Sequence, residues 1–303
     1  MIALAAAIVA STAVGVWAER RRGASARRAA HGALDAIFYG LLPFVTFFAL
    51  ARLHVTAGVG VGIGLVYAEL AIVSTTAWLV ATPVLALSRP STGAVLCVVM
   101  LANTGFLGLA LAVALLGSSA LPAATAVDSL VSGPMFYLGA FVVGAAFGAR
   151  RGDGSLLARV TRNPPLIAAV AGLLAPAGAA PHALVQVAHA LVWVMLAAGF
   201  FALGVNLGAE ADDGALVFPP PLTPPVALTV GLRLVAAPGL LLGLSALVVR
   251  VPHAYLLQAA MPSGINSLVV GHAFGLDLRL IAAALAWTTA IALVAGLVGS
   301  ALA

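Results

Sequence analysis

The chain of 303 residues is 63% hydrophobic and only 8% charged, and its mean hydropathy is +1.17. A water-soluble domain of this composition would be coated in apolar surface, so the soluble classes of protein are excluded. The formal net charge of +5 comes with 14 Arg residues that are dispersed between apolar segments. This dispersion argues against nucleic-acid binding and indicates a protein that crosses a lipid bilayer several times.

Apolar segments of about 20 residues, the length that a bilayer core requires, recur along the whole chain. We expect ten membrane spans, separated by short polar interruptions. Their limits are 1–18, 34–51, 61–87, 92–116, 121–148, 164–180, 184–208, 223–249, 253–275 and 278–301. The expected fold class is therefore an all-α polytopic membrane protein.

The arginines also predict the orientation of the chain, because cytoplasmic loops of membrane proteins are enriched in basic residues. With the N-terminus outside the cell, most of the Arg residues fall in inward loops. These are Arg20, Arg21, Arg22, Arg27, Arg28, Arg89, Arg150, Arg151, Arg159, Arg162 and Arg279. We therefore expect a multi-pass protein of the inner cell membrane with both termini extracytoplasmic.

Two stretches carry polar residues and Gly where a continuous membrane helix would be weakened: LANTGFLGLA (Leu101–Ala110) and MPSGINSLVV (Met261–Val270). A shift of 161 positions aligns these stretches, and it also aligns the first five spans with the last five. Because five is an odd number, the second half would enter the membrane with the opposite orientation. The expected organisation is a repeat at 1–148, a cytoplasmic linker at 149–163 and an inverted repeat at 164–303. Chance self-similarity of an Ala-rich sequence is the alternative.

The two polar stretches also predict a binding site. In transporters with inverted repeats, broken helices near the midplane expose backbone groups that a continuous helix would satisfy. An Asn side chain supplies both a donor and an acceptor, and the positive N-termini of half-helices favour an anion. The alternative is that Asn103 and Asn266 only hold neighbouring helices together.

Two ionisable residues of opposite charge approach the membrane midplane, where each costs about 2.5–3.5 kcal/mol unless it is paired or hydrated. They are Glu69 in the third span and Arg233 in the eighth. The 161-residue shift places the equivalent of Glu69 one helical turn from Arg233, so an ion pair is conceivable. A positive charge at this depth would also offset the cost of bringing an anion there. The alternatives are a snorkelling side chain for Arg233 and a structural hydrogen bond for Glu69.

Asp128 lies about two turns into the fifth span, in AVDSLVSGP. A poorly solvated carboxyl group can bind and release a proton near neutral pH, so Asp128 is a candidate for coupling transport to protons. Glu69 is the second candidate. The alternative for Asp128 is a hydrated carboxylate at a helix end.

Five stretches form a recognisable set: NTGFLGLALAVALLG (Asn103–Gly117), RNPPLIAAVAGLL (Arg162–Leu174), FFALGVNL (Phe200–Leu207), RLVAAP (Arg233–Pro238) and MPSGINSLVVGHAFGLD (Met261–Asp277). On these stretches the chain resembles the auxin efflux carrier family of bacterial and plant transporters, which includes malonate-type carriers. The resemblance implies two inverted five-helix repeats with broken crossover helices 4 and 9, and small organic anions as substrates. It also implies substrate-binding roles for Asn103, Thr104, Gly105, Pro262, Ser263, Gly264 and Asn266.

Together these features predict a secondary active transporter that moves a small organic anion, a carboxylate, by alternating access. Proton coupling is favoured, and a sodium-coupled organic anion symporter of the bile-acid type is the alternative. A channel or a membrane scaffold is less favoured. Enzyme activity, a cofactor and a metal site are not expected, because no nucleophile with a base and no metal-ligating cluster occurs at depth. The lipid bilayer is a partner, and a homo-oligomer is left open.

The orientation can be tested with a single Cys reporter, because Cys97 is the sole native thiol. In a Cys97→Ala background, Ala24→Cys should resist a membrane-impermeant thiol reagent added to intact cells, since the arginine-rich loop should face inward. The same reporter should react after the membrane is opened. Labelling of Ala24→Cys from outside intact cells would contradict the topology.

Overall fold

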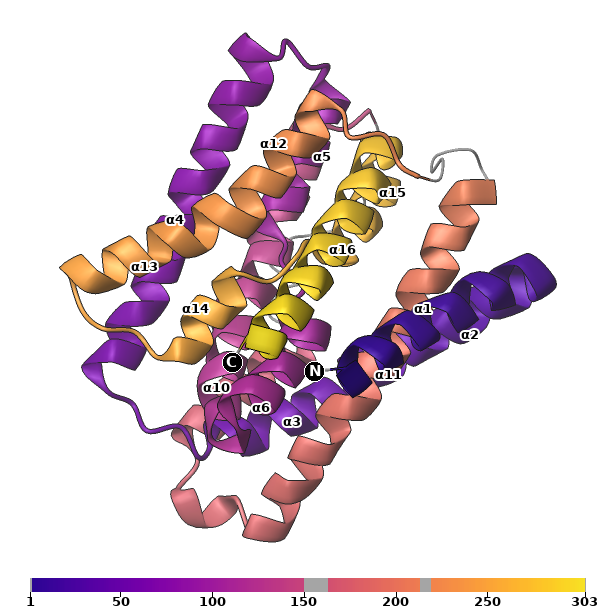
Figure 1. The fold of residues 1–303 in the computed structure, drawn as a ribbon. Coiled ribbons are helices and arrows are strands. Elements are labelled where there is room, and N and C mark those ends of the chain that lie inside the picture. The colour runs from indigo at the N-terminus through magenta and orange to yellow at the C-terminus, as the bar shows by residue number, and fades with distance from the viewer. Residues whose placement is uncertain (1, 150–162, 213–218, 303) are drawn as a thin grey trace.

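The computed structural model describes residues 2–149, 163–212 and 219–302 (Figure 1). Within these ranges the regular secondary structure is helical, apart from an isolated antiparallel bridge between Ala102 and Ser263, so the expected all-α class is confirmed. Six of the described helices are long and apolar enough to cross a membrane: Ala24–Leu50, Ala57–Val84, Ser118–Phe147, His182–Ala211, Pro224–Leu247 and Leu278–Gly296. Shorter apolar helices cover Arg89–Met100, Thr104–Leu116 and Pro164–Leu174. Nearly all of the linker expected at 149–163 lies outside the described residues.

Helices from both halves of the chain form a first bundle. Its members are α1 (Ile2–Arg22), α2 (Ala24–Ala36), α3 (Leu42–Leu50), α10 (Pro164–Leu174) and α11 (His182–Asp212). Helix α1 packs along α11, α10 packs along α3, and α11 also contacts α2 and α3. In Figure 1, α1 and α2 lie on the right, against α11.

The close packing of α1 on α11 depends on glycines. A Cβ atom at Gly15 would overlap the backbone of Phe201 and Gly204, and a Cβ atom at Gly204 would overlap the backbone of Thr12. Small residues allow helix backbones to approach inside a membrane, where van der Waals packing takes over from the hydrophobic effect. The two helices therefore form a rigid pair.

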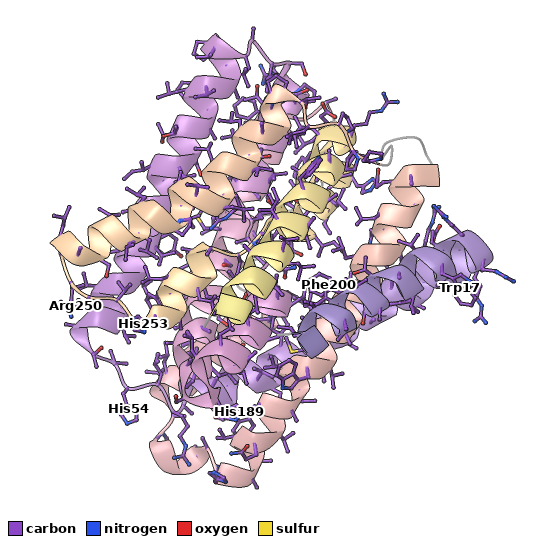
Figure 2. All side chains as sticks on the ribbon, in the orientation of Figure 1. Trp17, His54, His189, Phe200, Arg250 and His253 are labelled. Carbon is purple, nitrogen blue, oxygen red and sulfur yellow. The ribbon has the colours of Figure 1, made fainter. Side chains whose placement is uncertain are left out.

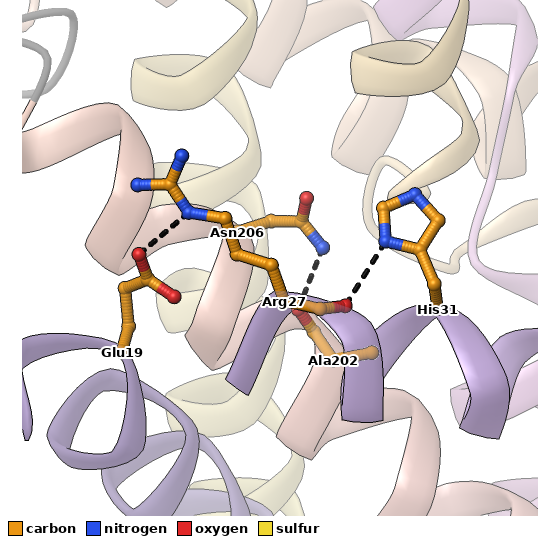
Figure 3. A network of polar contacts seen from close by, with 5 residues as sticks. All are labelled: Glu19, Arg27, His31, Ala202 and Asn206. Atoms are coloured by element: carbon orange, nitrogen blue, oxygen red, sulfur yellow. Dashed lines mark hydrogen bonds and ion pairs between the residues drawn. The ribbon is translucent and has the colours of Figure 1, made fainter. Parts of the chain in front are cut away.

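Polar contacts hold the arginine-rich end of this bundle (Figure 3). The buried carboxylate of Glu19 on α1 accepts a hydrogen bond from Arg27 Nε on α2 at 2.7 Å. His31 Nδ1 lies 3.0 Å from the Arg27 carbonyl oxygen, and Asn206 Nδ2 on α11 donates to the Ala202 carbonyl at 2.8 Å. Of these contacts, the pair of Glu19 and Arg27 joins α1 to α2.

A second bundle contains the remaining helices, again from both halves. They are α4 (Ala57–Leu79), α5 (Arg89–Met100), α6 (Leu109–Leu116), α7 (Leu121–Val127), α8 (Phe141–Phe147), α12 (Pro224–Gly231), α13 (Ala237–Leu247), α14 (His253–Ala259), α15 (Asn266–Phe274) and α16 (Leu278–Leu302). Helix α5 lies at the centre, packed against α4, α8 and α16 and buried from Thr92 to Met100. Helix α14 packs against α7 and α13, and α15 packs against α16 and α8.

Several of the membrane-length and shorter apolar helices contain π-helical turns. These turns lie at Ile37–Leu41, Val80–Val84, Thr104–Gly108, Asp128–Ser132, Met135–Ala140 and Leu232–Ala236. Turns of this kind are frequent at functional sites because they re-aim side chains and free backbone groups. Asp128 begins one of them, and Arg233 lies within another.

The two bundles meet through a small number of polar contacts. Thr46 Oγ1 on α3 lies 3.2 Å from Ser129 Oγ, and both side chains are buried. Glu210 Oε1 on α11 lies 2.6 Å from His272 Nε2 on α15. Helix α11 also packs against α6 and against the π-helical turn at Thr104–Gly108. The fold therefore places a boundary between two helical units beside the first polar stretch.

Candidate functional site

The first polar stretch lies between two helices. Helix α5 ends at Met100, and the chain resumes helical conformation at Thr104. Asn103 caps the resumed helix, because its Oδ1 atom accepts a hydrogen bond from the Leu107 amide at 3.2 Å. Such a cap satisfies one of the amides that a helix start leaves unpaired.

The second polar stretch also lies between two helices, and it crosses the first. Helix α14 ends at Ala259, and α15 begins at Asn266. The Asn103 amide donates to the Pro262 carbonyl at 2.7 Å, and the Gly264 amide donates to the Leu101 carbonyl at 2.7 Å. A shift of 161 positions converts one of these bonds into the other, so the two stretches contact each other through equivalent residues.

Gly264 allows this close crossing. A Cβ atom at this position would lie 3.0 Å from the Ala102 carbonyl oxygen and 3.4 Å from the Asn103 amide nitrogen. Both atoms belong to backbone that the crossing itself holds in place. A side chain at position 264 would therefore force the two stretches apart.

Arg233 binds the carbonyl ends of both interrupted helices. It is 1% exposed, and it donates from Nε to the Met261 carbonyl at 3.1 Å and from Nη1 to the Val99 carbonyl at 3.0 Å. Its Nη2 atom donates to the Ala259 carbonyl. These oxygens lie at or just beyond the ends of α5 and α14, where a helix leaves carbonyl groups unsatisfied.

Glu69 on α4 is also buried, and neither of its carboxyl oxygens has a hydrogen-bond partner among the residues that the structure describes. Its charge interacts with that of Arg233, but the two side chains form no direct ion pair. The pairing that the sequence made conceivable is therefore an electrostatic interaction at a longer range.

Asp128 faces the first break. Its Oδ1 atom accepts a hydrogen bond from Thr104 Oγ1 at 2.6 Å, and the carboxyl group lies beside Gly105, where a Cβ atom would be 3.2 Å from Oδ1. Asp128 is 8% exposed, and Thr289, the residue that a shift of 161 positions aligns with Asp128, is also buried. Neighbouring Thr288 accepts a bond from the Ser263 amide at 3.3 Å, so each half supplies a polar side chain to one break.

A cavity of about 390 Å³ lies where the two breaks meet the first bundle. Its polar lining consists of Asn103, Thr104, Gly105, Asp128, Ser129, Ser132, Asn163, Gly264, Asn266, His31, Asp35, Tyr39 and Tyr137. No Arg or Lys occurs among the described residues of this lining. The amide of Asn266 is exposed to the cavity at the start of α15.

A sequence model of the membrane transport protein family, which includes the auxin efflux carriers, matches residues 150–298, about half of the chain. The chain belongs to this family. Multi-pass organisation and membership together make it a membrane transporter. No curated protein matches the chain. In the described part of the transporter, no group of three or more His, Cys, Asp or Glu side chains could hold a metal ion.

The transporter brings most of the residues named from sequence to this one cavity. Asn103, Thr104, Gly105, Gly264, Asn266 and Asp128 all line it. Pro262 and Ser263 take part in the crossing but do not line the cavity. The Pro262 carbonyl accepts a hydrogen bond from the Asn103 amide, and Ser263 Oγ donates to the Val98 carbonyl at 3.0 Å. Arg233 and Glu69 do not line the cavity.

Other polar residues of the site were missed in the sequence. Asn163 lines the cavity and caps α10, accepting the Leu166 amide at 3.2 Å, and the Asn-Pro-Pro sequence is a helix-start signal that could have revealed it. Gln258 on α14 donates to the carbonyls of Thr104 (3.3 Å) and Ala124 (3.1 Å). Gln258 could have been singled out in the sequence because it places a polar amide side chain within an apolar span.

Proposed function

We propose that this protein is a secondary active transporter of small organic anions, with the cavity at the two breaks as the substrate site. The observation that carries the proposal is the convergence of two helix starts, at Thr104 and Asn266, on one cavity that also carries the polar side chains of the site. Helix starts present unpaired amides and partial positive charge, and they favour a carboxylate. The Asn103 and Asn266 amides can supply further donors.

The electrostatics of the lining favour a substrate of low charge. The positive potential comes from helix starts rather than from a fixed cation, since the described lining has no Arg or Lys. It also contains two carboxyl groups, Asp35 and Asp128, which repel a polyanion. Small carboxylates are therefore the substrate class that we propose.

Proton coupling follows from the place of Asp128. A carboxylate substrate at the first break would lie near the Asp128 carboxyl group, and two like charges at close range disfavour each other. A proton on Asp128 removes this repulsion and adds a donor. Proton and anion would then bind together and be released together, which is the requirement for symport.

Alternating access is the mechanism that we propose for translocation. A shift of 161 positions maps the Asn103–Pro262 hydrogen bond onto the Gly264–Leu101 hydrogen bond, and this equivalence supports two inverted repeats. In this proposal α5–α6 and α14–α15 are the broken crossover helices. The cavity draws its lining from both bundles, so motion of one bundle against the other would change access to it. The first bundle would act as a support, and the second would carry the site.

The proposed location is the inner cell membrane, with both termini outside. In Figure 2, Trp17 at the arginine-rich end of α1 lies on the opposite side of the molecule from His54, Arg250 and His253. These three residues belong to the segments expected outside. Arg21 stacks over the Trp17 ring at 5.7 Å, an arrangement suited to a membrane interface.

Two other mechanisms make different predictions. A sodium-coupled symporter would lose transport when Na⁺ is replaced by K⁺, whereas a proton-coupled carrier would not. A channel would show flux that does not saturate with substrate concentration. Uptake of radiolabelled malonate and acetate into proteoliposomes, measured with and without Na⁺ and over a range of concentrations, separates the three.

Asn266→Ala should weaken carboxylate binding by about 1–3 kcal/mol, because it removes an exposed amide from the cavity without breaking a structural contact. Asn103→Ala should weaken binding similarly and also cost about 1 kcal/mol of stability, because Asn103 caps a helix. Calorimetric binding of malonate and thermal unfolding of the purified variants separate these effects.

The matched control for these two variants is Asn206→Ala, which removes an amide from α11 outside the cavity. It should leave the affinity for malonate unchanged. Native affinity in both Asn103→Ala and Asn266→Ala would instead assign the two side chains to helix packing.

Asp128→Asn should abolish uptake driven by a pH gradient while substrate exchange across the membrane persists, because Asn keeps the shape of the side chain but cannot change its charge. The control is Asp35→Asn, which removes the other carboxyl group of the cavity, an exposed one, and should keep pH-driven uptake. Accumulation of malonate by folded Asp128→Asn in response to a pH gradient would remove Asp128 from the coupling mechanism.

A further inference from the structure

A single guanidinium group connects the carbonyl ends of both broken helices. Arg233 donates to Val99 near the end of α5 and to Ala259 and Met261 at the end of α14. A helix C-terminus carries partial negative charge, and two such ends beside each other strongly attract a cation. In a membrane, where water is absent, that cation has to come from the protein or from a bound ion.

The arrangement resembles the ion sites of sodium-coupled carriers in its chemistry. In such carriers, unwound carbonyls and the C-terminal ends of half-helices coordinate the Na⁺ ion whose binding is coupled to transport. In this protein the three carbonyls are already hydrogen-bonded to a planar group with fixed donor directions. That group is covalently attached to the chain and cannot dissociate during a transport cycle.

We propose that Arg233 is a resident cation, a positioning residue that takes the place of a coupling sodium ion and holds the two breaks together without one. This inference rests on the proposed transport function, because only a transporter has a coupling ion for Arg233 to replace. It assigns the carrier to sodium-independent chemistry and leaves Asp128 as the group that couples transport to an ion. Arg233 acts on the substrate only through the backbone of the two breaks, since it does not line the cavity.

Glu69 supplies the compensating charge. Its carboxyl group is buried on α4, which packs against α13 and the π-helical turn that carries Arg233, and the two charges interact. The guanidinium of Arg233 and the carboxylate of Glu69 belong to the same bundle. Their charges cancel, so a movement of this bundle would carry no net charge from the pair through the membrane. The pair therefore allows a cation to remain inside the membrane throughout the cycle.

The test is rescue of an Arg233→Ala variant by free guanidinium, measured as thermal unfolding of the purified protein without substrate. Removal of the side chain leaves the carbonyls unpaired, so the Tm should fall by roughly 5 °C or more. Guanidinium at millimolar concentration, far below denaturing levels, should recover at least about half of this loss. Sodium should recover none, because three carbonyls spaced for a planar fork do not form the cage that a metal ion needs.

Arg52→Ala is the matched control, since Arg52 also donates to a backbone carbonyl, that of Ala180, but away from the breaks. Guanidinium should not raise its Tm. Arg233→Ala that is not stabilised by guanidinium, or is stabilised equally by Na⁺, would overturn the inference. If Arg233→Ala does not accumulate, Arg233→Lys decides, because it keeps the charge and should be more stable than Arg233→Gln; equal stability of the two contradicts a resident cation.

The wild-type protein provides a separate readout. Replacement of Na⁺ by K⁺ should change neither its Tm nor its uptake of malonate, and a sodium requirement would contradict the inference. Failure of the proposed function would be visible as an absence of carboxylate binding by the wild-type protein. The guanidinium and sodium effects on Tm would remain measurable in that case, so the two failures are distinguishable.

Discussion

The requirement that every backbone group inside a membrane be satisfied governs this structure. Two helix breaks expose four helix ends near one another, and the protein treats the two kinds of end differently. The carbonyl groups at the ends of α5 and α14 accept hydrogen bonds from Arg233. The two polar stretches that cross each other are joined by hydrogen bonds from the Asn103 and Gly264 amides. The residues that begin the resumed helices, Thr104 and Asn266, line the cavity. This asymmetry is the physical basis for proposing an anion as the ligand.

The division into two bundles bears on the proposed movement between them. The second bundle contains both breaks, Arg233, Glu69 and Asp128, so its charged groups would stay together in the proposed alternating-access movement. In the first bundle, glycines allow α1 to pack closely on α11. Between the bundles the polar contacts are few, such as the one between Thr46 and Ser129. A boundary with few polar contacts is compatible with a second arrangement of the same parts.

Local signals in the sequence predicted the fold class and those cavity residues that belong to the two breaks or face them. A polar residue or a Gly in an apolar chain is conspicuous, so Asn103, Asn266 and Asp128 could be singled out without knowledge of the packing. The partners of Arg233 could not be predicted, because they depend on which carbonyls the two breaks leave unpaired. The contribution of Ser129 depends on how a helix of one bundle faces the other, and no local pattern encodes that.

The central claim, that movement of the second bundle against the first carries the anion, can be tested by fixing the two together. Thr46 and Ser129 face each other across the boundary with their hydroxyl oxygens 3.2 Å apart, so Cys residues at both positions in a Cys97→Ala background should form a disulfide on oxidation. The oxidised protein should still bind malonate but lose exchange across the proteoliposome membrane, and reduction should restore it. Undiminished exchange in the fully cross-linked protein would contradict the account.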